Sequence, residues 1–572
     1  MERVWTAHYD PDVPSTLSYP DFIVPDLLSA AAKDYSDRPA LRYYGATISY
    51  AELDGLTTRF AHALTHLREE GARGVVGVML PNLPQTVIAY FGSLKAGASV
   101  TPINPLYVEQ EIAHQVADAG CDTIIALPQF YTRIAPLVGR TCLKRVILTG
   151  PEEYLPWFKR LLYPWVKRKE RERDHVPVST ATIPWRRLIR HPLETHLTRV
   201  SPDDLALLQY TGGTTGTPKG VMLTHRNLVG NTLQCCHWMP SLRKGEEKFL
   251  AVLPFFHVYG MSACQNLSVS VAGCLTLLPR FQVGEVLKTI EQDRITVFPG
   301  IPAMYSAINN YQHLERHNLR SIRLCISGAG PLHPGVQRRF ETLTGARLVE
   351  GYGLTEASPV THVNPIHPAE DQRRRRSIGL PLPDTDVAIR DVETGQVDLP
   401  IGEVGELVIR GPQVMQGYWN RPEETHQVLR DGWLYTGDMA RMDHDGFFYI
   451  EDRKKDMIKS GGENVYPREV EEALCRHPKV KEAVVVGIPL GLRGELIKAY
   501  VVPAEGEQAS AAELFEHCRK ELAKFKVPKK IEFRSALPKT IVGKVLRRVL
   551  LEEELKKRKP DEQEAQEREP AS

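Results

Sequence analysis

The chain has 572 residues, of which 42% are hydrophobic and 25% are charged, and its formal net charge at pH 7 is +2. This length exceeds what one hydrophobic core organises, so we expect at least two domains. The composition is typical of a globular protein, and the small net charge gives the whole chain no basis for binding nucleic acid. No apolar run approaches the ~20 residues needed to cross a bilayer.

Nine cysteines without a C-x-x-C pair indicate reduced thiols, and no export signal is visible at the N-terminus. We therefore expect a cytoplasmic protein.

Between residues 75 and 350, short β-rich apolar runs such as FLAVLP and ITVFPG end in glycine or a polar loop. Amphipathic stretches of helical length, such as VGEVLKTIEQD, lie between them. Buried strands that alternate with helices predict α/β layers with largely parallel sheets. Ligands bind such sheets just beyond the C-terminal ends of the strands.

After residue 380 the pattern changes to EVGELVIRG, the turn DHDG and FFYIEDR, which predicts a smaller antiparallel section. Helix and strand patterns alternate again after the charged run EDRKK. The sequence therefore predicts an α/β fold in three parts. Residues 1–452 form a large N-terminal domain of α/β layers plus a small β-barrel-like section, 453–550 form a small mobile α+β domain, and 551–572 form a charged, disordered tail.

The stretch YTGGTTGTPKG follows the apolar run LALLQ and has the composition of a phosphate-binding loop. Its glycines allow backbone N–H groups to approach a ligand closely, its threonines add hydroxyl donors, and its lysine adds a positive charge. The order of residues is not that of a Walker loop. The alternative is a flexible surface turn. The residues concerned are Thr211, Gly212, Gly213, Thr214, Thr215, Gly216, Thr217 and Lys219.

A second motif, GYGLTE, begins at Gly351, and together with the first loop it resembles the adenylate-forming superfamily. This superfamily comprises acyl-CoA synthetases, peptide-synthetase adenylation domains and beetle luciferases. Further blocks support the resemblance in the family's order: LPFFHVYG, YTGD, DRKKDMIKSGGENVYP and PKTIVGKVLRR. The segments DRKKDMI and NVYPREVEE most closely resemble the sequences of bacterial long-chain fatty-acid–CoA ligases.

The resemblance implies a two-step reaction. The carboxylate of a fatty acid attacks the α-phosphorus of ATP, with Mg²⁺ as cofactor, and an acyl-adenylate forms as pyrophosphate leaves. The thiol of coenzyme A then displaces AMP. In this reading, the glycine-threonine loop holds the β- and γ-phosphates.

The resemblance also implies a role for individual residues. For ATP, it implies that Tyr352, with Gly351 and Gly353, contacts adenine, that Thr355 contacts the α-phosphate, that Glu356 binds Mg²⁺, and that Asp438 and Arg453 contact the ribose. It implies that Lys544 is catalytic and that His257 gates the entry of the carboxylate. In the C-terminal domain, it implies that Lys455 is the hinge and that Gly461 and Gly462 contact the pantetheine arm. Taken singly, Asp438 is more often a turn residue, Lys544 a solvated charge and His257 a packed core residue.

The sequence defines the carboxylic acid substrate less well. Amino-acid-activating relatives carry an aspartate after the phenylalanine of the histidine block, and LPFFHVYGMSACQNL has no acidic residue. Small residues could leave room for an aliphatic tail or serve close packing: Gly260, Ser262, Ala263, Gly328 and Ala329. We expect a long-chain fatty acid. An aryl- or medium-chain acyl-CoA ligase, a luciferase-like oxygenase and a catalytically silent acyl- or nucleotide-binding protein are the alternatives.

One insertion, residues 154–173, mixes tryptophan, phenylalanine and leucine with lysine and arginine. From 157 to 173 it holds seven basic and two acidic residues. This pattern is consistent with peripheral contact with the inner face of an anionic membrane, and equally with a solvated flap packed on its own domain. The sequence leaves the oligomeric state open between monomer and homodimer.

Overall fold

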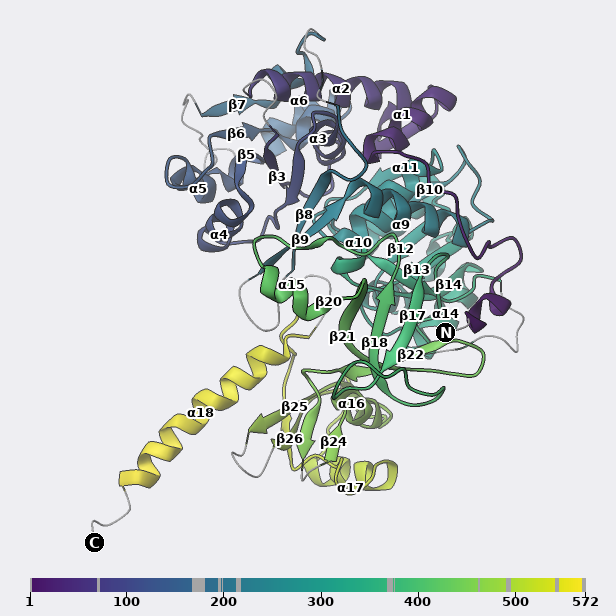
Figure 1. Ribbon diagram of the computed structural model, residues 1–572, viewed down its shortest axis with the longest axis vertical. Coiled ribbons are helices and arrows are strands. Elements are labelled where there is room, and N and C mark those ends of the chain that lie inside the picture. Colours follow the sequence, from purple (N-terminus) through teal and green to yellow (C-terminus); the bar gives the residue numbers. More distant parts are fainter. Residues whose placement is uncertain are drawn as a thin grey trace.

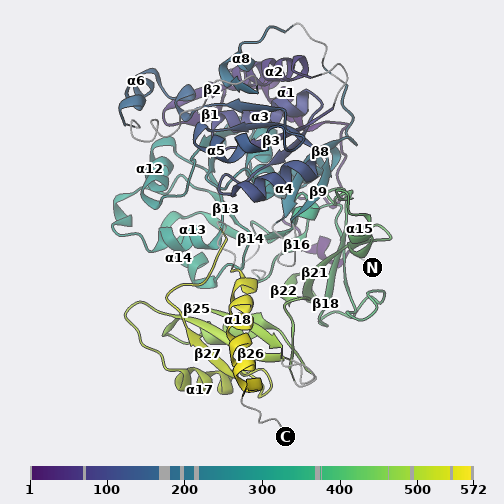
Figure 2. The same ribbon diagram turned by 90° about the vertical axis from the view of Figure 1, so that its left-hand side faces the viewer.

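A computed structural model describes residues 3–68, 73–166, 181–193, 197, 199–211, 218–367, 374, 376–460, 463–489, 495–540 and 545–567. Two large, mostly parallel sheets form one end of the molecule, and an antiparallel sheet adjoins them (Figure 1). The C-terminal residues form a separate lobe at the end far from the first helices (Figure 2).

The first sheet has eight strands, several of which are apolar runs buried on both faces. Its strands are β3 (Val75–Met79), β4 (Ser99–Pro102), β5 (Cys121–Ala126), β6 (Arg145–Leu148), β7 (Thr182–Pro184), β8 (Leu205–Thr211), β9 (Lys219–Thr224) and β19 (Gly417–Tyr418). They lie in the order β19-β9-β8-β4-β3-β5-β6-β7. The pairs from β8 to β7 are parallel, and β9 and β19 add antiparallel strands at one edge.

The second sheet has nine strands in the order β16-β15-β14-β13-β12-β10-β11-β1-β2. These are β1 (Pro39–Tyr43), β2 (Ala46–Ser49), β10 (Lys248–Ala251), β11 (Cys274–Leu277), β12 (Val297–Gly300), β13 (Leu324–Ser327), β14 (Arg347–Gly353), β15 (Val360–Val363) and β16 (Leu380–Pro381). Its central pairs, from β14 to β1, are parallel. The predicted α/β layers are therefore confirmed.

Helices lie between the two sheets, because α9 contacts β8 and β9 of the first sheet and also α11, which contacts β11 of the second. The helices of this region are α1 (Val24–Asp34), α2 (Tyr50–His66), α3 (Pro84–Lys95), α4 (Glu109–Ala119), α5 (Tyr131–Ile134), α6 (Trp157–Val166), α8 (Trp185–Ile189), α9 (His225–Trp238), α10 (Val258–Gly260), α11 (Leu267–Ser270), α12 (Val283–Asp293), α13 (Pro302–Asn309) and α14 (Pro334–Thr344). A π-helix, η5 (Met261–Asn266), joins α10 to α11.

Short 3₁₀ helices complete this region: η1 (Val4–His8), η2 (Pro128–Phe130), η3 (Ala135–Leu137), η4 (Pro151–Tyr154), η6 (Leu314–Arg316) and η7 (Thr355–Ala357). Local signals set several helix starts. Ser49 and Glu52, for example, form a capping box at the start of α2.

The predicted antiparallel section is a five-stranded sheet. Its strands are β17 (Asp386–Arg390), β18 (Gly405–Arg410), β20 (Leu429–Arg430), β21 (Trp433–Met442) and β22 (Phe448–Arg453), and α15 (Pro422–Val428) precedes β20.

The C-terminal lobe has apolar clusters of its own, so it is a compact unit. It contains β23 (Ile458–Ser460), β24 (Glu463–Val465), α16 (Pro467–Cys475), β25 (Val480–Pro489), β26 (Glu495–Pro503), α17 (Ala511–Glu521), β27 (Lys530–Phe533) and α18 (Arg547–Glu567).

The predicted mixed fold, with a large N-terminal and a smaller C-terminal part, is confirmed. The structure differs at the tail, where α18 remains helical to Glu567 although we expected disorder from residue 551. Within the described ranges, no helix combines the length and apolar character that crossing a bilayer requires.

Candidate functional site

The ends of the predicted phosphate-binding loop are held by a hairpin. β8 and β9 pair antiparallel, with Thr211 opposite Lys219. The six residues between Thr211 and Pro218 that were predicted to contact phosphate, Gly212, Gly213, Thr214, Thr215, Gly216 and Thr217, lie outside the described residues. The loop therefore leaves the C-terminal end of a central strand, as a ligand-binding loop in an α/β sheet does.

Lys219 of this loop and Glu356 of the motif GYGLTE both contact the side chain of Tyr418. Lys219 forms an ion pair with Glu424, and its ammonium group lies 5.0 Å from the ring centroid of Tyr418. The Tyr418 hydroxyl donates a 2.8 Å hydrogen bond to Oε1 of Glu356. Because β19 pairs with β9, Tyr418 is fixed beside the strand that begins with Lys219. This arrangement places a cation and a carboxylate near the C-terminal end of the predicted phosphate-binding loop.

A second cluster joins the other two predicted nucleotide-binding segments. The Tyr352 hydroxyl donates to Oδ2 of Asp438, and Arg453 contacts Oδ1 of the same carboxylate at 3.1 Å. Asp438 lies opposite Arg453 in the pairing of β21 with β22 and is only 4% exposed. The Asp438 carboxylate raises the pKa of the Arg453 guanidinium. A buried, charge-paired carboxylate on a strand that is paired on both sides is held in a fixed position, which suits the recognition of sugar hydroxyls.

Glu356 and Thr355 lie on η7, one residue beyond β14, which carries Gly351, Tyr352 and Gly353. The backbone N–H of Met415 donates to the Glu356 carbonyl at 2.8 Å. The motif GYGLTE thus bridges the second sheet and the segment that leads to Tyr418.

The loop that carries His257 is clamped by side chains from the first sheet region. The amide of Asn82 donates to the carbonyls of Ala251 and Leu253 at 2.9 and 2.8 Å, and its oxygen accepts from the Phe255 N–H. Gln209, on β8, donates to the Phe256 carbonyl at 3.0 Å. The strand that leads into the phosphate-binding loop therefore also positions the histidine loop.

Burial lowers the pKa of His257 to about 4, because desolvation disfavours the charged imidazolium. This value lies below the ordinary pKa of histidine, so the side chain loses its proton well below neutral pH and is neutral above about pH 5. A neutral imidazole fits a packing and gating role rather than a proton-transfer role.

We therefore expect no inflection between pH 6 and 8 that depends on His257. The pH profile of kcat/KM for the acid should keep its shape in His257→Gln, even if its height falls. A wild-type inflection near pH 6.5 that disappears in this variant would contradict the assignment.

The remaining predicted residues surround the junction with the C-terminal lobe. Lys455 lies in the turn after β22, and its side chain reaches solvent. Desolvation by the surrounding protein and the positive charge of Arg453 lower the pKa of its ammonium group. Gly461 and Gly462 lie outside the described residues, between the paired strands β23 and β24. Lys544 also lies outside them, just before Val545, which forms a bridge with Lys539.

Sequence reasoning missed three positioning residues: Asn82, Gln209 and Tyr418. Each contacts the site through a long-range hydrogen bond, and none belongs to a motif that marks a loop or a ligand. Gln209 directly precedes YTGGTTG, which was the only signal available.

The hydroxyl of Tyr418 gives a direct test of this site. We expect Tyr418→Phe to raise the KM for MgATP about 10-fold, since a hydrogen bond to a charged group contributes about 1.5 kcal/mol or more. The measurement is initial-rate kinetics over a range of ATP and Mg²⁺ concentrations. The matched control is Tyr435→Phe, which removes a hydroxyl of β21 that donates to the Gly395 carbonyl and accepts from Arg390. Equal effects in the two variants would argue against a role for the Tyr418 contact.

Two of the small residues that could have left room for an acyl tail, Gly260 and Gly328, are closely packed instead. A Cβ on Gly260 would lie 2.4 Å from the Pro254 carbonyl oxygen, and one on Gly328 would lie 3.0 Å from the Tyr259 ring. The Tyr259 hydroxyl bonds the carbonyls of Gly300 and Ile326.

Comparisons with known proteins agree with this geometry. The AMP-binding enzyme family matches residues 28–419, and the AMP-binding enzyme C-terminal domain matches residues 469–544. A long-chain-fatty-acid–CoA ligase of Bacillus subtilis is 45% identical over 97% of this chain and 98% of its own length. A protein of the same name from Yersinia pestis is 39% identical over 97% of this chain and 99% of its own. The crystal structure of ATP-bound MatB from Rhodopseudomonas palustris superposes with a TM-score of 0.80 at 28% identity, covering 93% of this chain and 99% of that one.

The fold of two α/β sheets with a C-terminal lobe, together with these matches over nearly the whole chain, defines a nucleotide-dependent ligase. The chain belongs to the AMP-binding enzyme family. The family predicted from the sequence motifs is confirmed.

Proposed function

We propose that the protein joins a long-chain fatty acid to coenzyme A through an acyl-adenylate and releases AMP and pyrophosphate. The observation that carries this proposal is that Lys219, at the end of the predicted phosphate-binding loop, and Glu356 both contact Tyr418. Full-length similarity to relatives named long-chain-fatty-acid–CoA ligase supports the choice of acid and thiol.

ATP is held by residues from both clusters. The loop from Thr211 to Thr217 and Lys219 bind the β- and γ-phosphates, with backbone N–H groups and hydroxyls as donors. Asp438 accepts from the ribose hydroxyls and Arg453 donates to the sugar. Tyr352, between Gly351 and Gly353, lies against adenine, and Thr355 donates to the α-phosphate.

Magnesium fits the residues present. Mg²⁺ prefers one or two carboxylates combined with substrate phosphates, and Glu356 is a carboxylate held in place by the Tyr418 hydroxyl. When bound with ATP, the ion neutralises phosphate charge as pyrophosphate leaves.

The second half-reaction uses the C-terminal lobe. We infer domain boundaries at 452/453 and near 550, with Lys455 as the hinge about which the lobe rotates. Lys544 contacts the reacting oxygens during adenylation and withdraws before the thiol of coenzyme A approaches. Gly461 and Gly462 then lie against the pantetheine arm, where a side chain would obstruct it. His257 lies beside the carboxylate and gates its entry.

Pyrophosphate release tests this function. It is measured with acids from acetate to oleate and with cinnamate, each with and without coenzyme A. We expect the highest kcat/KM with long-chain acids and formation of the thioester only with coenzyme A. A maximum at cinnamate or at medium-chain acids would favour the aryl or medium-chain alternative, and no release with any acid would favour a catalytically silent binding protein. Light emission without coenzyme A would indicate a luciferase-like reaction.

We also propose that α6 contacts the inner face of an anionic membrane. Four apolar side chains of this helix face solvent: Trp157 is 76% exposed, Phe158 47%, Leu161 66% and Leu162 60%. The basic run that follows in the sequence, from Lys167 to Arg173, lies outside the described residues. An exposed apolar helix face next to basic residues matches an interfacial helix, and each basic residue near such a surface contributes about 1 kcal/mol.

Co-sedimentation with liposomes tests the membrane contact. At low salt we expect binding to vesicles with anionic lipid and little binding to neutral ones. Replacing Trp157 and Leu161 by serine should weaken the binding, and the same changes at the exposed Leu106 and Val108 serve as the control. No binding of the wild type to anionic vesicles would overturn the proposal.

A further inference from the structure

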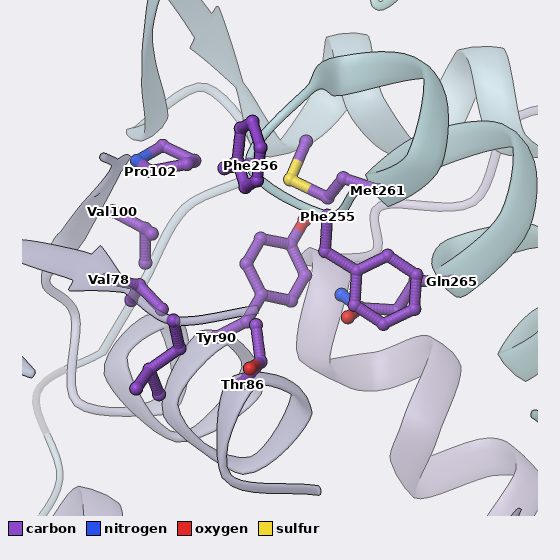
Figure 3. A pocket seen from close by; sticks show the side chains of 10 residues that line it. Val78, Thr86, Tyr90, Val100, Pro102, Phe255, Phe256, Met261 and Gln265 are labelled. Atoms are coloured by element: carbon purple, nitrogen blue, oxygen red, sulfur yellow. The ribbon is translucent and has the colours of Figure 1, made fainter. Parts of the chain in front are cut away.

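A small cavity lies next to the histidine loop, at the C-terminal ends of two parallel strands of the first sheet. Val78 of β3 and Val100 of β4 form one wall, and Phe255, Phe256 and Met261 form the other (Figure 3). Ligands of α/β sheets bind beyond these strand ends. The cavity is therefore in the position expected for part of a substrate.

The cavity adjoins the groups that handle ATP and the carboxylate. Phe256 directly precedes His257, and its carbonyl accepts the hydrogen bond from Gln209 of β8. Two residues further along, β8 ends at Thr211, where the phosphate-binding loop begins. The cavity has a volume of about 10 Å³ as it stands, which is room for one water-sized group, so a chain attached to a carboxylate beside His257 would have to widen it as it passes Phe256.

One lining residue is not apolar. Gln265 is 1% exposed, and neither its amide nitrogen nor its amide oxygen has a hydrogen-bond partner within the described part of the chain. In Figure 3 its amide end is directed toward the side of the cavity that holds Tyr90 and Thr86. Most buried side-chain amides are paired, because an unpaired polar group in an apolar environment is costly.

The other two polar side chains of the cavity each have a hydrogen-bond partner. The Thr86 hydroxyl donates to the Pro81 carbonyl, and the Tyr90 hydroxyl accepts from Asn266 at 3.2 Å. Gln265 therefore has a donor and an acceptor that a ligand can use at one point on an otherwise apolar wall. It also lies on the π-helix η5, an irregularity that frequently occurs at functional sites.

We propose that Gln265 is a specificity-determining residue that selects acyl chains with a hydroxyl group at the depth of this cavity. The inference rests on the proposed acyl-CoA ligase function and refines its substrate class. A hydroxyl can donate to the amide oxygen and accept from the amide nitrogen, whereas a methylene leaves both unpaired. Sites with buried polar groups reject analogues that cannot pair with them more strongly than apolar sites reject an added hydroxyl.

The test compares ω-hydroxy acids with unsubstituted acids of the same length, from octanoate to hexadecanoate, so that the hydroxyl is moved stepwise away from the carboxylate. Pyrophosphate release gives kcat/KM for each acid in the wild type and in Gln265→Met, which nearly conserves volume and removes the amide. At one chain length, we expect the wild-type ratio of hydroxy to unsubstituted acid to exceed that of the variant at least ~10-fold. Ser268→Ala removes another buried hydroxyl, which lies outside the cavity and has no hydrogen-bond partner among the residues that the structure describes, and it should leave the ratio unchanged.

Equal ratios in the wild type and Gln265→Met at every length would overturn the inference, and they are expected if a water molecule alone satisfies the amide. If no acid supports pyrophosphate release, the proposed function fails. The present inference is then tested separately, by the shift in melting temperature that each acid causes in the absence of ATP. A larger shift with the hydroxy acid that is lost in Gln265→Met supports it, and equal shifts overturn it.

Discussion

Replacing Lys544 by alanine is expected to slow adenylation about 10³-fold and to change thioester formation from preformed acyl-adenylate only a few-fold. The reason is electrostatic. Negative charge shifts onto the bridging oxygen as the carboxylate attacks phosphorus, and a fixed ammonium group stabilises that charge in the transition state more than in the ground state. Once the adenylate has formed, the proposed mechanism withdraws Lys544, so the second step does not use it.

The two half-reactions are measured separately, by acid-dependent exchange of pyrophosphate into ATP and by the conversion of added acyl-adenylate with coenzyme A. Lys539→Ala is the matched control, because Lys539 lies in the same segment and pairs with Glu482 at 2.7 Å on the C-terminal lobe. An equal loss in both half-reactions for Lys544→Ala would mean that the residue serves folding or general binding rather than adenylation.

The second large effect is expected at the proposed hinge. Proline at position 455 fixes φ near −65° and restricts the residue before it. Among the described backbone hydrogen bonds, those at this turn are donated by Lys454 to Gly437 and by Asp456 and Met457 to Arg453. Lys455→Pro therefore removes no hydrogen bond that the structure describes and should hinder rotation of the lobe, although proline at the third position of the Arg453–Asp456 turn also restricts Lys454. We expect pyrophosphate release in a single turnover to be nearly unchanged and thioester formation to fall about 100-fold.

Lys455→Ala separates the backbone effect from the loss of the ammonium group, and we expect it to retain most of the thioester-forming activity. The measurement is rapid-mixing kinetics of acyl-CoA formation from acyl-adenylate. If Lys455→Pro converts acyl-adenylate at the wild-type rate, rotation about this residue is not part of the reaction.

Much of the architecture follows from local sequence. Buried strands such as VVGVM and CDTIIA have a continuous apolar pattern that distinguishes parallel sheets, and the turn DHDG marks the antiparallel section. The motifs also identified Asp438 and Arg453, which the structure brings into contact.

The contacts that complete the site could not be predicted in the same way. Tyr418 reaches Glu356 only because β19 adds to the edge of the first sheet, and that pairing depends on tertiary structure. Gln265 looks like an ordinary helical residue in sequence, and only the packing around it reveals an unpaired amide.

The tail was misjudged for a related reason. Its sequence lacks a continuous apolar face, yet the first turns of α18 are anchored to the lobe by the buried Leu550 and by the ion pair of Glu554 with Lys498 at 2.6 Å. The pair Arg548 and Glu552, four residues apart, adds local support for the helix.

The path of one oxygen atom tests the central chemical step most directly. The protein is incubated with a long-chain acid labelled with ¹⁸O in its carboxylate, together with ATP, Mg²⁺ and coenzyme A, and the products are analysed by mass spectrometry. Attack of the carboxylate on the α-phosphorus predicts one labelled oxygen in AMP and none in pyrophosphate. Formation of ADP, with the label in inorganic phosphate, would show that the acid is activated at the γ-phosphorus and would contradict the mechanism.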